Sequence, residues 1–310
     1  MSFSSDVKEE MTHVSPECSH CERAVLAALV RIEGTLHFEG AGRFSLEFAS
    51  DVAAVARLAT RLFHGMYELR TNLVMRRSVL HKNVNYLVDI PGQPGLTEAL
   101  TDLGVLNAEG GIELGISPHL VEKNCCAGAY LRGAFLGSGF VSDPKSDSHF
   151  EITVESEELA QGLIGLMELK GVRARMMQRR NSTTVYLKSG ADIVDFLTFS
   201  GAHSSALRME EARVMKSVRN EVNRQTNADM ANQRKASNAA VDQVFAARKV
   251  VEKYGLENLS PALQEFIRLR VAYPDESLKE LGAHAVPPLS KSAVYHRVRR
   301  MMEMAQDIEG

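Results

Sequence analysis

The sequence lacks the features of membrane and secreted proteins. No stretch approaches the roughly 20 apolar residues that span a bilayer, and residues 1–10 lack the basic-then-apolar pattern of a signal peptide. The four cysteines among 310 residues are too few for a disulfide scaffold. We therefore expect a cytoplasmic protein with no membrane partner. A hydrophobic content of 45% supports cores for more than one domain.

A duplication is present instead. Two similar apolar stretches, residues 26–34 and 131–139, begin 105 positions apart, and similar residues follow each of them. This self-similarity predicts that residues 1–202 form one α+β domain. Its two copies, at about 20–110 and 125–202, would each fold as an αββαββα unit.

Both stretches resemble the LAGLIDADG signature of homing endonucleases, in which two signature helices pack side by side at the centre of a pseudo-symmetric pair. Small residues at Ala27, Ala28 and Gly133 favour such a close helix contact. In those nucleases an acidic residue just before the final glycine of each helix holds a divalent metal. The corresponding residues here are Glu33 and Ser138.

One of the two metal-binding carboxylates is therefore missing. A serine hydroxyl does not supply the negative charge that Mg²⁺ needs between two substrate strands. We expect no catalytic residue, no enzyme activity and no metal in this domain. On this interpretation Glu33 is a solvated residue at the end of a helix.

The cysteines allow two interpretations. Cys18 and Cys21 have the spacing of a zinc ligand pair, and Cys125 and Cys126 would complete the set. Adjacent cysteines, however, seldom serve one tetrahedral structural site, where spacings of two to four are usual. Cys21 and Cys126 also lie at equivalent positions of the two copies, which favours small core residues. We therefore predict no metal and no cofactor.

Basic residues recur in the predicted strands of both copies. In homing endonucleases these strands form the saddle that lies on DNA, so the residues could form an auxiliary DNA-binding surface. They could equally keep an open sheet solvated and its edges unpaired, or bind a protein partner. The residues are Arg76, Arg77, Lys82, Arg175, Arg179 and Arg180.

The following segment, residues 203–255, reads as a helical linker. Two helices are predicted, at 204–223 and 236–254, with an amide-rich stretch between them. Because amide-rich helices bury little, the segment is either a solvated linker or a polar contact surface. The charge also changes here: residues 1–202 carry a net −6, and residues 203–310 carry +3.

Residues 256–310 have the pattern of an all-α helix-turn-helix domain. Ser260 and Pro261 start one helix, with Leu263, Phe266, Ile267 and Val271 directed inward. A short helix follows Ser277, and the last helix follows Ser290. Residues 289–300 contain no acid, as expected for a helix that enters the major groove. The residues predicted to bind DNA are Ser290, Lys291, Ser292, Tyr295, His296, Arg299 and Arg300.

This arrangement is similar to that of the WhiA family of bacterial regulators. The similarity rests on residues 125–137, 186–188, 220–224, 277–282 and 287–292, and it covers essentially the whole chain. It implies a promoter-binding transcriptional regulator linked to cell division, chromosome segregation and sporulation, with an inert nuclease-like domain. It also implies a nucleoid location and promoter DNA as a partner, with RNA polymerase, a sigma factor or another regulator as candidate protein partners. The alternative is a metal-dependent, site-specific DNA endonuclease.

Overall fold

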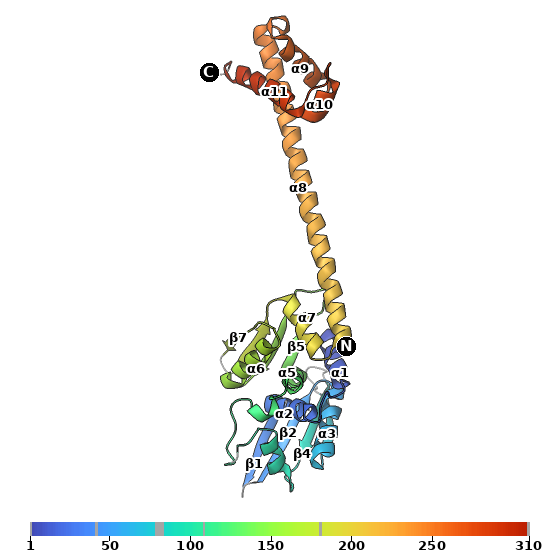
Figure 1. Cartoon of the computed structure of the whole chain (residues 1–310), viewed down its shortest axis with the longest axis vertical. Coiled ribbons are helices and arrows are strands. Elements are labelled where there is room, and N and C mark those ends of the chain that lie inside the picture. Colours follow the sequence, from blue (N-terminus) through green and yellow to red (C-terminus); the bar gives the residue numbers. More distant parts are fainter. Residues whose placement is uncertain (1, 41–42, 78–83, 108, 180–181, 309–310) are drawn as a thin grey trace. The chain divides into compact units, whose positions relative to one another are not determined.

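The chain folds into two units, each with its own core. The structure, a computed structural model, describes residues 2–40, 43–77, 84–107, 109–179 and 182–308 (Figure 1). Residues 1–216 form a mixed α+β unit, and residues 217–310 form a helical unit. The mixed α+β class predicted from the sequence is confirmed.

The N-terminal unit contains the predicted duplication. A short helix, α1 (Phe3–Thr12), precedes two copies of the same αββαββα order. The first copy consists of α2 (Cys21–Glu33), β1 (Gly34–Gly40), β2 (Arg43–Ser50), α3 (Ala53–Tyr67), β3 (Asn72–Arg77), β4 (Val84–Ile90) and α4 (Leu96–Asp102). The second, after the 3-10 turn η1 (Pro118–Leu120), consists of α5 (Asn124–Ser138), β5 (Gly139–Val141), β6 (Phe150–Val154), α6 (Glu157–Leu169), β7 (Ala174–Arg179), β8 (Ser182–Leu187) and α7 (Gly190–Phe199).

The two sheets have the same topology. Their strand orders are β1-β2-β4-β3 and β5-β6-β8-β7, and all neighbouring strands are antiparallel. Central strand β6 alternates fully buried and half-buried residues, the period-two pattern of a sheet with one face on a core. In contrast, β3 and β7 are edge strands, which is why their side chains are largely exposed.

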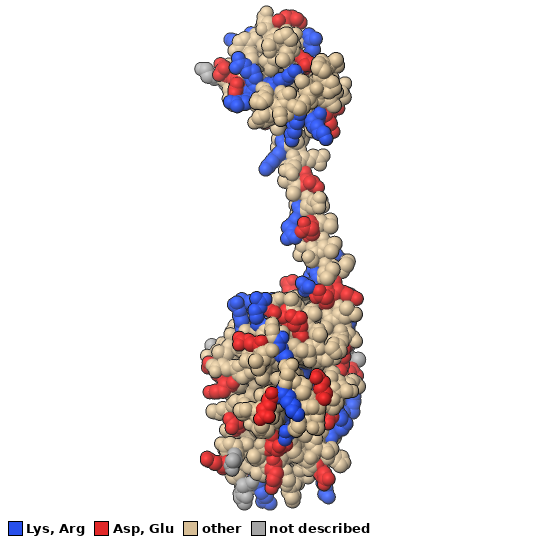
Figure 2. Space-filling view, viewed as in Figure 1, with Lys and Arg blue, Asp and Glu red and all other residues tan. Residues whose placement is uncertain are grey.

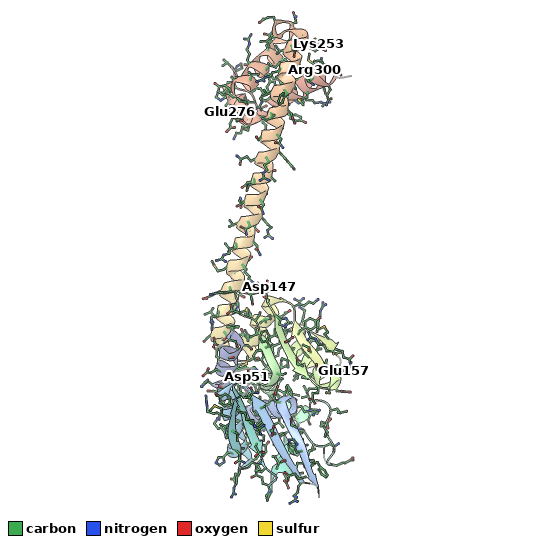
Figure 3. All side chains as sticks on the ribbon, turned by 180° about the vertical axis from the view of Figure 1, so that it is seen from behind. Asp51, Asp147, Glu157, Lys253, Glu276 and Arg300 are labelled. Carbon is green, nitrogen blue, oxygen red and sulfur yellow. The ribbon has the colours of Figure 1, made fainter. Side chains whose placement is uncertain are left out.

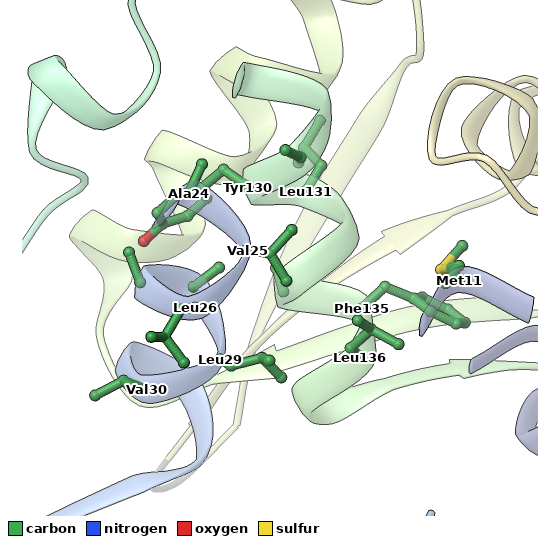
Figure 4. Packing of buried hydrophobic residues seen from close by; sticks show 14 of the residues in the cluster. Met11, Ala24, Val25, Leu26, Leu29, Val30, Tyr130, Leu131, Phe135 and Leu136 are labelled. Atoms are coloured by element: carbon green, nitrogen blue, oxygen red, sulfur yellow. The ribbon is translucent and has the colours of Figure 1, made fainter. Parts of the chain in front are cut away.

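The two signature helices, α2 and α5, lie side by side in the core of this unit (Figure 4). Leu26 and Leu29 of α2 and Leu131 and Phe135 of α5 are fully buried. A Cβ atom added to Gly133 would lie 2.9 Å from the Cβ of Ala28 and would clash with the backbone of Val25. Only glycine therefore allows this helix–helix distance.

The linker differs from the prediction. A single continuous helix, α8 (His203–Tyr254), replaces the two expected helices. The amide-rich stretch 224–235 is exposed and fully helical. No glycine or proline occurs between residues 203 and 254, so nothing in the backbone stops the helix. Among the described residues, no helix combines the length and the apolar character needed to cross a membrane.

The C-terminal unit packs three helices against the end of α8. After the 3-10 turn η2 (Leu256–Asn258) come α9 (Pro261–Ala272), α10 (Leu278–His284) and α11 (Lys291–Gln306). Its core includes Ala247 and Val250 of α8, which are fully buried. A domain that began at residue 256, as expected from the sequence, would omit part of this core. The prediction that Val271 points inward is wrong: its side chain is 47% exposed.

Candidate nucleic-acid interface

Helices α10 and α11 form the helix-turn-helix, and their caps explain where they begin. Ser277 and Glu280 form a reciprocal capping box at the start of α10. Ser290 accepts a hydrogen bond from the N–H of Ala293, 3.2 Å away, at the start of α11. Between the helices, Gly282 packs against the backbone of Leu289, where a larger side chain would clash with the carbonyl oxygen. The turn geometry is thus encoded by two serines and a glycine.

Helix α11 separates an apolar face from an exposed one. The apolar spacing predicts a buried stripe of Val294, Val298, Met301 and Met302. The first three are buried in the core of the C-terminal unit, and Met302 is half-buried. All seven residues predicted to bind DNA, from Ser290 to Arg300, are exposed. They therefore share the outer surface of one helix and of its N-cap. The hydroxyl of Ser290 is occupied by capping, so the other six side chains form the exposed polar surface of this face.

Salt bridges distinguish the basic residues of α11. Arg297 donates to Glu265 at 2.6 Å and so fastens α11 to α9. Arg299 pairs with Glu303 of the same helix at 2.9 Å. Lys291 and Arg300 form no ion pair within the described part of the chain. Arg300 projects from α11 (Figure 3), and Lys and Arg side chains gather on the visible face of this unit (Figure 2). Lys291 and Arg300 are therefore the cations most available to phosphate.

A buried arginine that the sequence analysis missed shapes the loop before α10. Arg270 of α9 is 1% exposed. Its Nη1 donates to the carbonyl oxygens of Tyr273, Pro274 and Glu276, at 3.4, 3.3 and 2.7 Å. Burial lowers the pKa of the Arg270 guanidinium. The sequence offers no signal for this role, because Arg270 alternates with apolar residues that indicate only a helix.

The predicted auxiliary surface lies on the edge strands. Arg76 of β3 and Arg175 and Arg179 of β7 are exposed. Arg77 ends β3, but its side chain lies outside the described structure, and Lys82 and Arg180 lie outside the described residues. Exposed apolar side chains accompany these arginines, including Met75 and Met177 at 66% and 44% exposure. The surface is accessible, and its role stays a prediction.

Glu33 and Ser138, the residues that the resemblance places at the two metal-ligand positions, lie at the C-terminal ends of the signature helices. Ser138 donates to the carbonyl oxygen of Thr153 and accepts from its N–H at 3.1 Å, so its hydroxyl is committed to β6. Glu33 is half-buried, so the expectation of a solvated residue is wrong. Desolvation raises the pKa of the Glu33 carboxyl, and the charge of Lys8 opposes that shift.

Lys8 of α1 is the second functional residue that the sequence analysis missed. It is 7% exposed, and its ammonium donates to the carbonyl oxygen of Gly137 at 3.0 Å. The same ammonium lies 3.9 Å from Asp51 and attracts Glu33. Burial lowers the pKa of Lys8, while these two carboxylates raise it. A buried protein cation thus lies beside Glu33 at the C-terminal ends of the two signature helices.

The four cysteines converge at the opposite ends of α2 and α5. All four Sγ atoms lie within 4.8 Å of one another. The expectation that adjacent cysteines do not share one site rested on spacing along the chain, and the fold brings the thiols together in space. The backbone N–H of His20 lowers the pKa of the Cys18 thiol to about 6, whereas burial raises that of Cys21 to about 11. These are the described residues best suited to hold a metal ion.

Comparison with known proteins agrees with this architecture. Three family models match in order: the WhiA N-terminal LAGLIDADG-like domain over residues 19–106, the WhiA LAGLIDADG-like domain over 127–219 and the WhiA C-terminal HTH domain over 222–305. In the last case the match includes the end of α8 that completes the C-terminal core.

Similar proteins span the full chain. The "Probable cell division protein WhiA" of Symbiobacterium thermophilum is 43% identical and covers 100% of this chain and 99% of its own length. That of Desulforamulus reducens is 41% identical, with coverages of 99% and 96%. A crystal structure of full-length DUF199/WhiA from Thermatoga maritima has the same fold, with a TM-score of 0.60, 22% identity and 99% coverage of both chains. With full-length relatives above 40% identity and all three domain models matched in order, the chain belongs to the WhiA family.

Proposed function

We propose that this protein is a sequence-specific DNA-binding transcriptional regulator that reads promoter DNA through α10 and α11. The observation that carries the proposal is the outer face of α11, where six exposed polar or basic side chains occur without an acid among residues 289–300. A recognition helix needs such a face, because both the phosphates and the groove repel carboxylates. The names of the relatives, "Probable cell division protein WhiA", support a role in cell division.

The exposed residues divide into two groups by their position on α11. Lys291, Ser292, Tyr295 and His296 lie in its first two turns and would meet base edges in the major groove. Arg299 and Arg300 lie a turn later and would reach phosphates. Because Arg299 already pairs with Glu303, Arg300 is the stronger phosphate ligand of the two.

The nuclease-like domain would be catalytically inert. Lys8 places a positive charge beside Glu33, and the hydroxyl of Ser138 is hydrogen-bonded to β6. The two halves therefore do not supply one free carboxylate each. Metal-dependent cleavage requires ligands negative enough to hold Mg²⁺, and a neighbouring ammonium repels that ion. A metal-dependent, site-specific endonuclease remains the alternative function, because Glu33 itself is retained.

The domain would instead bind DNA or a protein partner. Its exposed arginines, Arg76, Arg175 and Arg179, fit an auxiliary DNA surface, and the exposed methionines beside them fit a protein partner. Candidate protein partners are RNA polymerase, a sigma factor and another regulator. The protein would also act in chromosome segregation and sporulation, and it would be located on the nucleoid.

Selection from a random DNA pool with the full chain tests the proposal. We expect one enriched sequence, and we expect the enrichment to disappear in Tyr295→Ala. Supercoiled plasmid incubated with the protein and Mg²⁺ or Mn²⁺ should stay intact. Enrichment of no sequence would contradict the regulator proposal, and metal-dependent nicking that is lost in Glu33→Gln would establish the endonuclease alternative.

A further inference from the structure

The four thiols of the N-terminal unit come from three separate places in the chain. Cys18 lies in the loop before α2, Cys21 is the first residue of α2, and Cys125 and Cys126 lie in the first turn of α5. Cys21 and Cys126 are buried, and the other two are half-buried. This arrangement follows from the duplication, since the two signature helices run side by side and begin at the same end of the pair.

The distances between the sulfur atoms match one tetrahedral ion. The Sγ of Cys18 lies 3.5 Å from that of Cys21 and 3.6 Å from those of Cys125 and Cys126. Four thiolates around zinc at about 2.3 Å stand about 3.8 Å apart in a regular tetrahedron. We propose that Cys18, Cys21, Cys125 and Cys126 bind a single structural zinc ion.

Two other uses of four cysteines fit the geometry less well. A disulfide requires two sulfur atoms about 2.05 Å apart, and all four cysteines are free thiols at the longer distances given above. An iron–sulfur cluster inserts several iron and sulfide atoms between its thiolates, which then lie farther apart than the thiolates of a single ion. The limit of 4.8 Å for all four sulfur atoms therefore favours one ion.

The surroundings compensate the charge of such a site. Zinc with four thiolates carries a net charge of −2, and the N-terminal ends of α2 and α5 provide partial positive charge at the same place. His20 lies 3.9 Å from the Cys18 sulfur, and Lys123 lies 3.5 Å from His20. Arg132 of α5 is buried, and its charge acts on Cys21. Two buried and two half-buried thiols near the Lys123 and Arg132 cations fit a bound metal better than they fit a purely apolar core.

The ion would act as a structural clamp. It would join the loop after α1 to the starts of both signature helices, at the end of the pair opposite to Glu33 and Ser138. The helix pair would thus have lost a catalytic ion at one end and would hold a structural ion at the other. Zinc bound by the folded state alone stabilises that state by mass action.

The metal content of the full chain, purified under reducing conditions without added metal, tests the proposal. We expect about one zinc per chain by elemental analysis. Cys18→Ser and Cys125→Ser should each lose that zinc, because serine is a poor zinc ligand, while Ser19→Ala, an exposed neighbour, should retain it. Removal of zinc with a chelator should lower the Tm of the wild-type chain by roughly 5 °C or more, and ZnCl2 should restore it.

Replacement of zinc by CoCl2 provides a readout of geometry that does not depend on the variants. A tetrahedral thiolate site gives Co²⁺ an intense visible absorption together with a sulfur-to-metal charge-transfer band. Both bands in the wild-type chain would support the proposal. A chain without metal whose four thiols all react with a thiol reagent would overturn it, as would a native disulfide, stoichiometric iron in place of zinc, or full zinc in Cys18→Ser.

Discussion

Lys8 and Glu33 form a pair of opposite charges at the C-terminal end of α2, and they differ in burial. The lysine is almost fully buried and is held by the carbonyl oxygen of Gly137, whereas the glutamate is half-buried beside the same glycine. Burial disfavours the charged form of each residue, and their mutual attraction only partly offsets that cost. The free energy of unfolding should therefore depend on pH through this pair of residues.

Glu33→Gln should raise the Tm at pH 7. Because desolvation raises the pKa of Glu33, the folded state binds this proton more tightly than the unfolded state. Its contribution to stability is complete below the ordinary value of 4.5 and is lost as pH rises through the raised value. Glutamine imitates the protonated form at every pH. The advantage of the variant in thermal unfolding should therefore disappear as pH falls below 4.5.

Glu122→Gln is the control for this measurement, since Glu122 is exposed. It should leave the Tm unchanged across the same pH range. A Glu33→Gln variant that is less stable than the wild type at pH 7 would show that attraction to Lys8 outweighs desolvation.

Arg270→Met should destabilise the C-terminal unit by about 1–3 kcal/mol, because the carbonyl oxygens of the α9–α10 loop lose their buried donor. Because methionine keeps most of the side-chain volume, the loss of unfolding free energy measures the contribution of the hydrogen bonds. Arg268→Met is the matched control: Arg268 is 63% exposed, and its 3.9 Å ion pair with Glu257 should contribute at most about 1 kcal/mol. Urea unfolding of both variants measures the difference. Equal losses would contradict the role of Arg270.

At the scale of elements, the contact of α2 with α5 depends on a single glycine. Gly133→Ala places a methyl group against the backbone of Val25, so the helices must separate, at a cost of about 1–3 kcal/mol. Gly165→Ala on α6 is the control, since no atom lies within 4 Å of its added Cβ. That substitution should stabilise the protein by roughly 0.5–1 kcal/mol. Denaturant unfolding in which both variants gain stability would refute the close packing.

The sequence predicts these elements unevenly, for physical reasons. The duplication and the apolar stripe of α11 depend on local patterns, and the structure contains both. The hydroxyls of Ser277 and Ser290 cap their helices, whereas Ser260 stands at the N-cap of α9 without a side-chain capping bond. The continuity of α8 depends on the absence of glycine and proline, whereas its amide-rich polar stretch predicts a break between two helices. Likewise, the spacing of the cysteines along the chain does not reveal that two helix starts meet. The inward direction of Lys8 and Arg270 depends on tertiary contacts and has no local signal.

At the scale of the whole molecule, the chain consists of two units, residues 1–216 and 217–310, each with its own core. Residues 1–202 carry a net −6, and residues 203–310 carry +3. The positively charged segment includes residues 289–300, the acid-free stretch at the start of α11. The central claim is therefore that the C-terminal unit reads the DNA sequence.

The most direct test measures the affinity of full-chain variants for a preferred and a scrambled duplex at several salt concentrations. Tyr295→Ala should weaken binding to the preferred duplex by about 1–3 kcal/mol and reduce the preference over the scrambled duplex. Arg300→Ala should weaken both duplexes alike and reduce the salt slope by about one unit. Arg175→Ala with Arg179→Ala, on β7, should leave the ratio of the two affinities unchanged. A preference that survives Tyr295→Ala and disappears in the β7 variant would contradict the account.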